Sequence, residues 1–298
     1  MSQTLLLSHG PLSLALCEEG GACTSLRWQA RGQAGFEVLE PRPAGSVEVF
    51  KQASFALTPY SNRLFGGQLI TPDATLTLPN NHPAQPMPLH GVGWRLAWQL
   101  SQRSADSAEL RYHYQPDAHW PFEHECSQQV RLSPTVARFE MSLRNLSPGP
   151  MPAGLGFHPC FALEEDSLIN FAAASVWTQD SHGRPQTEAA SAGKPRFDFA
   201  APRQAMDVVQ DHCHAHWQGT ATLTHPARRI SVTLTASPEL DHLMIYRQPG
   251  MPWLCVEPVS HATGAFSLPG LNQATSGARW LQAGESLTVW MELRLTAT

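Results

Sequence analysis

A histidine held in an apolar turn is the first residue of this chain whose setting suggests chemistry. Residues 156–161 read Gly-Phe-His-Pro-Cys-Phe, so His158 stands between Phe157 and Pro159. Pro159 fixes its own backbone and favours an extended conformation for His158. An imidazole titrates near neutral pH and can act as a general acid. Taken alone, however, a histidine in such a turn is more simply explained as a ring that fills the turn.

A lone carboxylate gives this histidine a possible counterpart. Glu257 interrupts the apolar run Trp-Leu-Cys-Val-Glu-Pro at residues 253–258, which is otherwise typical of a buried strand. An unpaired carboxylate is costly to bury, so a structural ion pair or an outward-facing position would explain it. The functional alternative is a general base whose pKa is set by its pocket. If His158 and Glu257 face one pocket, they suit paired proton transfer.

Two further segments carry polar side chains that could hold a ligand. Asn62 and Arg63 place an amide beside a guanidinium in a stretch typical of a turn. Arg63 could donate two hydrogen bonds to a polyol or a carboxylate, although a solvated arginine is the simpler alternative. His90 is followed by Gly91 and Gly93, small residues that would let a ligand approach the backbone closely.

A histidine-rich segment raises the question of a metal site. Residues 211–217 read Asp-His-Cys-His-Ala-His-Trp. On a strand, His212, His214 and His216 would share one face, and imidazoles at that spacing can hold zinc. Nothing else in the sequence requires a metal, so we expect no metal site. We interpret Asp211 instead as an acceptor of ligand hydroxyl groups and Trp217 as a packing residue.

Composition excludes several classes of protein. Hydrophobic residues make up 42% of the 298 residues, which argues against disorder. The net charge of −5 and the absence of a basic run make nucleic acid an unexpected partner. No apolar stretch has the length needed to cross a bilayer, and the start at Met1 lacks a secretion signal. Phosphate-cradle, dinucleotide and hydrolase-elbow motifs are also missing. We expect a cytoplasmic protein that binds neither membranes nor nucleic acid.

The cysteines are expected to be free. No Cys-x-x-Cys pair occurs, and several of the cysteines lie inside strand-like apolar runs. Free buried thiols are therefore the better interpretation than disulfides. The six residues are Cys17, Cys23, Cys126, Cys160, Cys213 and Cys255.

Hydrophobic residues recur with a period of two, which predicts strands. The alternation is clear at residues 110–114, 139–143, 230–234 and 287–295, and each run predicts a strand with one face in the core. With 21 glycines and 25 prolines falling mostly between such runs, the pattern favours a large antiparallel sandwich or barrel. No segment reads as a linker, so we expect one domain over residues 1–298. Residues 181–205 are the most loop-like part and are expected to form a surface excursion.

Taken together, these segments resemble the aldose 1-epimerase, or galactose mutarotase, family. The resemblance runs in order through the Asn-Arg pair, Leu-His-Gly at 89–91, Gly-Leu-Gly-Phe-His-Pro-Cys-Phe at 154–161, Asp211, and Val-Glu-Pro at 256–258. The Gly-x-His-Pro-x-Phe and Cys-Val-Glu-Pro pieces are specific when they occur together in this order. The chain is short, has Cys160 where tyrosine is common, and lacks the usual form of the aspartate segment, so it resembles a compact branch of the family.

This resemblance implies a fold, an activity and roles for named residues. The fold would be a large antiparallel β-sandwich, an all-β supersandwich, acting as an isomerase that interconverts the α and β anomers of a free aldohexose such as galactose or glucose. His158 would be the general acid and Glu257 the general base. His90 and Arg63, with Asn62 beside them, would contact the sugar, and Asp211 would fix its orientation. The resemblance implies no cofactor and no metal, and we expect a monomer or a homodimer.

Two alternatives remain open from the sequence. A hexose-6-phosphate 1-epimerase would need a cationic clamp, but the chain has only Lys51 and Lys194 as lysines and its arginines are scattered. A carbohydrate-binding module on the same scaffold would have no need of both an acid and a base. The acid–base pair therefore favours an enzyme acting on an unphosphorylated sugar.

Overall fold

Strands make up most of the chain in a computed structural model that describes residues 4–30, 32, 34–46, 48–83, 85–271 and 273–297. The strands of the first half are β1 (Thr4–His9), β2 (Leu12–Cys17), β3 (Cys23–Trp28), β4 (Phe36–Leu39), β5 (Ala56–Leu57), β6 (Gln68–Ile70), β7 (Thr75–Thr77), β8 (Gln99–Arg103), β9 (Ser107–Tyr114), β10 (His124–Ser133) and β11 (Val136–Asn145). Those of the second half are β12 (Met151–Ala153), β13 (Gly156–Phe157), β14 (Cys160–Ala162), β15 (Leu168–Gln179), β16 (Pro185–Ala190), β17 (Arg203–Gln204), β18 (Gln210–His225), β19 (Ile230–Ala236), β20 (His242–Arg247), β21 (Trp253–Val259), β22 (Arg279–Leu281) and β23 (Ser286–Ala297).

Helical structure is confined to short turns in the described residues. The α-helix α1 spans Gln273–Ser276, and 3₁₀ turns lie at Val49–Lys51, Phe65–Gly67, Gly93–Arg95, Ala205–Asp207 and Pro226–Arg228. No described helix is long and apolar enough to cross a membrane. The start of the chain at Met1, interpreted above as lacking a secretion signal, lies outside the described residues.

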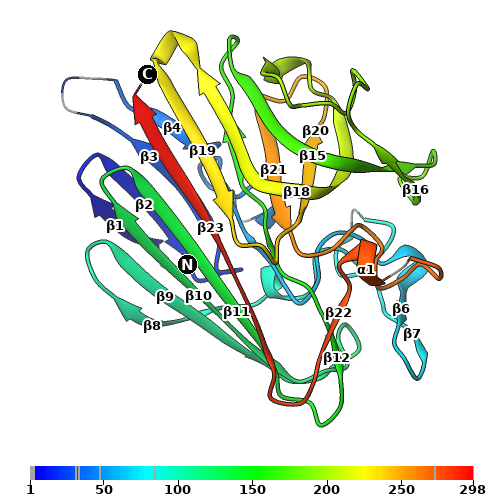
Figure 1. The fold of residues 1–298 in the computed structure, drawn as a ribbon. Helices are drawn as coiled ribbons and strands as arrows, with labels where there is room; N and C mark the ends of the chain where they lie inside the picture. The colour runs from blue at the N-terminus through cyan, green and yellow to red at the C-terminus, as the bar shows by residue number, and fades with distance from the viewer. Residues whose placement is uncertain are drawn as a thin grey trace.

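Antiparallel pairing joins most of the strands into one ladder (Figure 1). From β1 it passes through β2, β3, β4, β14, β21, β20, β18, β19, β23, β11, β10 and β9 to β8. The long strand β18 also pairs with β15, and β13 joins β21 and β5. Two small sheets, β12 with β22 and β6 with β7, lie outside this ladder.

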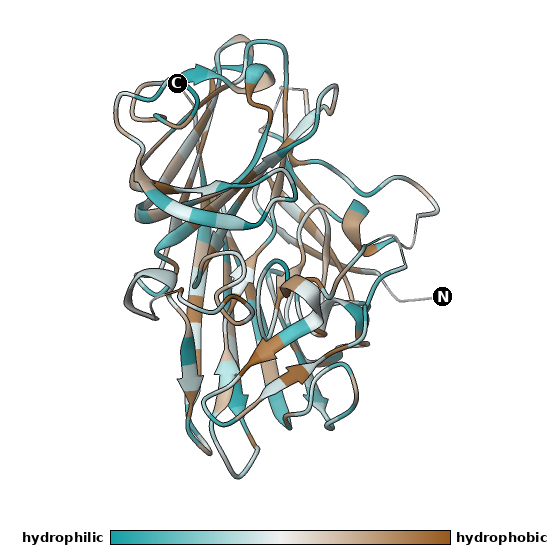
Figure 2. Ribbon diagram, turned by 90° about the vertical axis from the view of Figure 1, so that its right-hand side faces the viewer, coloured by the Kyte–Doolittle hydropathy of each residue, from teal (hydrophilic) through white to brown (hydrophobic). Residues whose placement is uncertain are grey.

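Strands from the two ends of the ladder pack face to face, β1 and β2 against β11 and β23. Inward side chains of β1 and β2 belong to the same hydrophobic cluster as those of β11 and β23. Along β11, Phe139, Met141 and Leu143 are buried, and Phe139 lies opposite Met291 of β23. Hydrophobic and hydrophilic residues alternate along several strands (Figure 2), as one buried face requires. The predicted all-β antiparallel sandwich is therefore confirmed.

The prediction of a loop over residues 181–205 is wrong in two parts. Arg203–Gln204 form the short strand β17, which pairs with β15. Pro185–Ala190 form the strand β16, which pairs with β15 through Ser175 opposite Ala190. This strand lies at the edge of the ladder, and much of it is exposed. An edge strand needs no continuous apolar face, so its sequence lacked the alternation that reveals inner strands.

One strand pairing sets the geometry of the candidate site. Cys160 of β14 lies opposite Cys255 of β21, and Gly156 of β13 lies opposite Val259. Between these points the backbone N–H of Val256 donates to the carbonyl of Pro159. The same register places His158 opposite Glu257. Because side chains two positions apart share a face of a strand, both cysteines point the same way as the histidine and the glutamate.

Candidate active site

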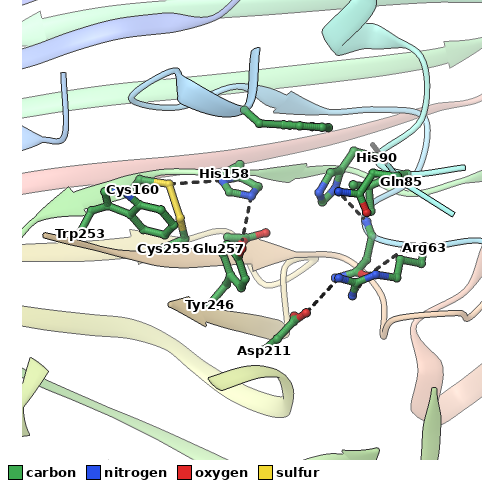
Figure 3. Close-up of a pocket in the computed structure, with 13 residues that line it drawn as sticks. Arg63, Gln85, His90, His158, Cys160, Asp211, Tyr246, Trp253, Cys255 and Glu257 are labelled. Carbon is green, nitrogen blue, oxygen red and sulfur yellow. Dashed lines mark hydrogen bonds and ion pairs between the residues drawn. A yellow bond between two sulfur atoms is a disulfide. The ribbon is translucent and has the colours of Figure 1, made fainter. Parts of the chain in front are cut away.

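The structure brings all six predicted site residues together around one cavity of about 210 Å³ (Figure 3). They come from the turn after β5, from the loop before β8, and from β13–β14, β18 and β21. The six are Asn62, Arg63, His90, His158, Asp211 and Glu257. Residues 181–205 are not among the described residues that line the cavity.

His158 and Glu257 contact each other at the floor of the cavity. Nε2 of His158 lies 3.3 Å from Oε1 of Glu257, and the two side chains are 12% and 3% exposed. Burial lowers the pKa of His158 to about 4. Burial, reinforced by the Asp211 carboxylate, raises the pKa of Glu257 well above its ordinary value, although the Arg63 guanidinium opposes this. The environment therefore favours the uncharged form of each group.

These opposite shifts reverse the usual order of proton affinity between the two groups. Ordinarily a histidine holds its proton about two pH units above a glutamate. Here burial weakens proton binding by His158 and strengthens proton binding by Glu257, so the one proton that the pair holds lies on Glu257. The uncharged pair and the ion pair have the same total charge and differ by one proton transfer across the contact. Such a pair can give a proton at one point of a ligand and accept one at another.

An aromatic residue packs against one face of the His158 ring. Phe55 stacks on the imidazole with ring centroids 4.4 Å apart and planes 19° from parallel. The backbone carbonyl of Phe55 accepts a hydrogen bond from the backbone N–H of His158. These contacts leave the edge of the ring free to meet Glu257 and the cavity.

Asn62 and His90 fix each other in unusual backbone conformations. Both have left-handed backbones, with φ of 58° at each, which asparagine and histidine adopt more readily than most residues. The backbone N–H of Asn62 donates to Nδ1 of His90 at 3.0 Å, and the backbone N–H of His90 donates to the carbonyl of Asn62. Since Nδ1 accepts, the ring proton of His90 lies on Nε2. Burial, followed by His158 and Arg63, lowers the pKa of His90 well below its ordinary value, so it is a neutral donor.

Arg63 and Asp211 form a charged rim at the cavity. Nη2 of Arg63 lies 3.0 Å from Oδ2 of Asp211, and Asn62 Oδ1 accepts hydrogen bonds from the backbone N–H and Nη1 of Arg63. Both charged side chains are partly exposed. Asn62 therefore orients the guanidinium, and Asp211 neutralises it. Donors and acceptors alternate along this wall, which suits a ligand that carries several hydroxyl groups.

The glycines after His90 have a different role from the predicted one. Neither Gly91 nor Gly93 is among the described residues that line the cavity. A Cβ on Gly91 would lie 2.2 Å from the Thr58 carbonyl oxygen, and one on Gly93 would lie 2.3 Å from the Thr58 side chain. The space at both glycines is thus filled by Thr58, through its backbone at Gly91 and its side chain at Gly93.

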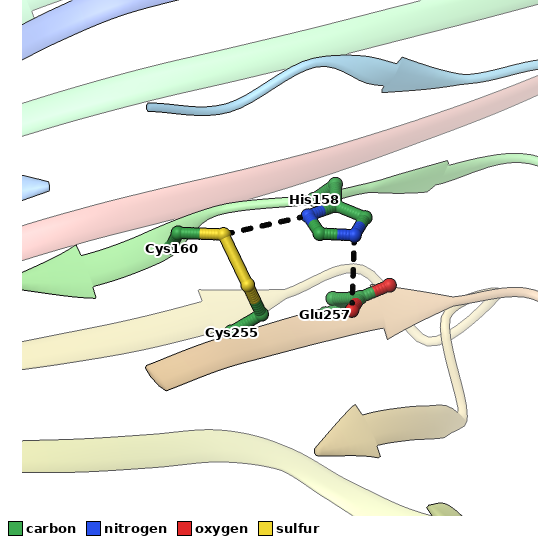
Figure 4. The surroundings of a disulfide bond; sticks show 4 residues. All are labelled: His158, Cys160, Cys255 and Glu257. Atoms are coloured by element: carbon green, nitrogen blue, oxygen red, sulfur yellow. Dashed lines mark hydrogen bonds and ion pairs between the residues drawn. A yellow bond between two sulfur atoms is a disulfide. The ribbon is translucent and has the colours of Figure 1, made fainter. Parts of the chain in front are cut away.

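The prediction of six free cysteines is wrong for two of them. Cys160 and Cys255 form a disulfide, and both line the cavity (Figure 4). Cys17, Cys23, Cys126 and Cys213 are free and buried, as predicted. The two bonded cysteines are far apart in the chain and are opposed only through the register of β14 and β21.

The histidine-rich segment does not form the metal cluster that its spacing allows. His212 and His214 are buried, but His216 has a left-handed backbone, is exposed, and lies 3.3 Å from Glu188. Among the described residues, the donor atoms of another group, His158, Cys160 and Cys255, lie within 4.8 Å of one another. With the disulfide formed, neither sulfur is a thiolate, so this group is not a ligand set in the observed state. Trp217 is buried, in agreement with its interpretation as a packing residue.

Sequence reasoning missed several residues of the cavity wall. Phe50, Gln85, Tyr246, Trp253 and Cys255 also line the cavity. Two of them carried a usable signal, because Trp253 and Cys255 precede Glu257 by four and two positions and so share its face of the strand. Tyr246 lies opposite Cys255 on the neighbouring strand β20, a relation that only the pairing reveals.

Comparison with known proteins agrees with this architecture. Among curated proteins, the chain is 25% identical over 296 residues to the uncharacterized protein YphB of Escherichia coli (strain K12), with 97% of each chain covered. Its structure superposes on a galactose mutarotase-like protein from Clostridium acetobutylicum with a TM-score of 0.86, at 18% identity over 99% of this chain and 95% of that one. It superposes on the GalM/aldose epimerase homologue from C. elegans with a TM-score of 0.85, at 14% identity over the whole of both chains. Residues 3–294 match the aldose 1-epimerase family, and the chain therefore belongs to that family.

Proposed function

We propose that this protein is an aldose 1-epimerase that interconverts the α and β anomers of a free, unphosphorylated aldohexose. The observation that carries the proposal is the contact between His158 and Glu257 in a cavity whose remaining polar groups suit hydroxyl groups. Family membership supports the class of reaction. The sugar and the roles of individual residues are our inference from the site.

The proposed reaction uses the shared proton of the pair. In the ion-pair form, the Glu257 carboxylate takes the proton of the anomeric hydroxyl while the His158 imidazolium protonates the ring oxygen. The ring opens to the aldehyde, the C1–C2 bond rotates, and closure on the other face returns both protons. Because burial lowers the pKa of His158 and raises that of Glu257, the uncharged pair is the favoured form, and the ion pair forms by transfer of one proton from Glu257 to His158.

The remaining polar groups would bind the sugar. His90 offers an Nε2–H donor, and the Arg63 guanidinium offers N–H groups that Asp211 and Asn62 hold in place. Asp211 can accept hydrogen bonds from sugar hydroxyls, and Trp253 is an aromatic residue of the cavity wall. Aromatic rings pack well against the apolar faces of pyranose rings, since both surfaces are poorly hydrated.

The charge of the cavity favours a neutral sugar over a phosphorylated one. Arg63 is the one lysine or arginine among the described lining residues, and Asp211 already pairs with it. A phosphate would need donors that are free to pair with it. The Asp211 carboxylate would further oppose a dianion.

The proposal is tested by NMR exchange between anomers across a panel of free aldohexoses and glucose 6-phosphate. We expect acceleration with one or more free sugars and a smaller effect on the phosphate ester. Glu257→Gln and His158→Asn should each reduce the rate by roughly 10²–10⁴-fold, as loss of one general acid or base does. His113→Asn, at an exposed site, is the matched control and should retain the rate.

Near-normal rates in both site variants would overturn the assignment of the acid and base. Sugar binding without acceleration in the unaltered protein would instead favour a binding module. Faster exchange of glucose 6-phosphate than of every free sugar would favour the phosphate ester as substrate.

A further inference from the structure

The Cys160–Cys255 disulfide is placed beside both members of the acid–base pair. It spans β14 and β21 at the position next to the His158–Glu257 contact on the same face of the two strands (Figure 4). Each cysteine is two residues from one member of the pair. Both cysteines line the cavity, and Cys160 is 8% exposed whereas Cys255 is fully buried, so a small reagent that enters the cavity reaches the disulfide from the side of Cys160.

One sulfur also contacts the histidine directly. Sγ of Cys160 lies 3.6 Å from Nδ1 of His158, while Nε2 of the same ring faces Glu257. A disulfide sulfur carries no hydrogen and can only accept a hydrogen bond. The Sγ–Nδ1 contact is therefore a hydrogen bond only when the neutral imidazole carries its proton on Nδ1. Nε2 is then unprotonated and can receive the Glu257 proton across the contact.

Reduction would reverse this preference. A Cys160 thiol can donate S–H to Nδ1, which then accepts, and the ring proton moves to Nε2. When Nε2 already carries the ring proton, it cannot receive another proton from Glu257. The ion pair needed for the proposed reaction would then form less readily, and the covalent link that holds β14 to β21 would also be lost.

We propose that the Cys160–Cys255 disulfide is a positioning element that holds His158 as the Nδ1–H tautomer, so that its reduction slows mutarotation. This inference rests on the proposed function. The reductant is a small dithiol. One of its thiolates attacks one disulfide sulfur and releases the other cysteine as a thiolate, and its second thiolate then attacks the mixed disulfide and releases the remaining cysteine. The dithiol becomes a cyclic disulfide, and its two electrons and two protons pass to Cys160 and Cys255 as two thiols.

The test compares oxidised and dithiothreitol-reduced protein, with a metal chelator present throughout. We expect reduction to lower kcat by roughly 10- to 100-fold, the usual effect of losing a group that orients a reacting residue, and reoxidation to restore it. Cys160→Ser supplies a hydroxyl that can donate to Nδ1 in either condition. This variant should have a low rate that the dithiol does not change, whereas Cys126→Ala should respond like the unaltered protein.

A second measurement keeps the inference separate from the proposed function. The ¹⁵N shifts of the His158 ring report which nitrogen carries the proton, whether or not the protein is active. A move of the proton from Nδ1 to Nε2 on reduction supports the inference. The same tautomer in both states, or equal rates in oxidised and reduced active protein, overturns it. Absence of activity in both states, together with the tautomer change, refutes the proposed function alone.

Discussion

Replacing Glu257 by glutamine should make the protein more stable at alkaline pH while it abolishes most of its activity. Glutamine has the shape of a protonated glutamate and can donate to His158 Nε2, but it never ionises. In the folded protein burial raises the pKa of Glu257 well above its ordinary value, whereas in the unfolded chain the carboxyl titrates near 4.3. Between these two pKa values the folded state holds a proton that the unfolded state has released.

The sign and size of the effect follow from this difference. Stability falls as pH rises wherever the folded state binds more protons, so the unaltered protein loses about 1.4 kcal/mol for each pH unit across this window. The Glu257→Gln variant does not lose this free energy, because glutamine does not ionise. The difference in unfolding free energy between the two proteins should be small near pH 4. It should then grow in favour of the variant until the pH reaches the raised pKa of Glu257.

Urea unfolding followed by circular dichroism at several pH values from about 4 to about 9 measures this difference. Glu48→Gln controls for the loss of a carboxyl group as such, because the Glu48 side chain is 63% exposed. A difference for Glu257→Gln that does not change with pH would refute the raised pKa. A variant that is less stable at alkaline pH would show that the carboxylate, rather than the carboxyl, is the form stabilised in the fold.

Two other perturbations test the environment of the site and of the core. Burial lowers the pKa of His124 to about 4 and that of His214 to about 3, so stability should fall as pH drops below the unfolded histidine value of about 6.5. Each of these two histidines should lower the free energy of unfolding by about 2 kcal/mol at pH 5. A urea midpoint that is the same at pH 7.5 and pH 5 would contradict this. Asp211→Asn removes the partner of Arg63 and should raise KM for a free hexose by about tenfold while it improves binding of hexose 6-phosphate. Steady-state comparison of the two sugars checks this expectation, and an unchanged ratio of their KM values would contradict it.

The sequence predicted the strands well where one face is buried. Residues 136–145 and 286–297 alternate clearly, and they form β11 and β23 with Phe139 opposite Met291. The edge strand at residues 185–190 has no such constraint and was taken for a loop. Alternation reports burial of one face, so strands outside the core carry little of the signal.

The residue types of the candidate site could be predicted from the sequence, but the contacts that hold those residues in place could not. Asn62 and His90 were recognised as polar groups, whereas their mutual hydrogen bonds depend on left-handed backbones that no sequence pattern specifies. The glycine after His90 suggested ligand contact, yet the space it leaves is filled by Thr58. At His216 a left-handed backbone turns the side chain outward, which breaks the alternation that a metal cluster would need.

A single structural relation, the register of β13 and β14 against β21, accounts for the proposed acid–base pair and the disulfide together. The pairing of Cys160 with Cys255 requires His158 to lie opposite Glu257, so the crosslink and the contact between His158 and Glu257 cannot be set independently. A slip of one residue along β21 would turn Glu257 away from the cavity and toward the face that carries Val256 in the hydrophobic core. Composition and local spacing cannot reveal that register, which is why the cysteines read as free thiols. Once the register is known, the disulfide beside His158 becomes a part of the site whose effect on proton transfer can be measured.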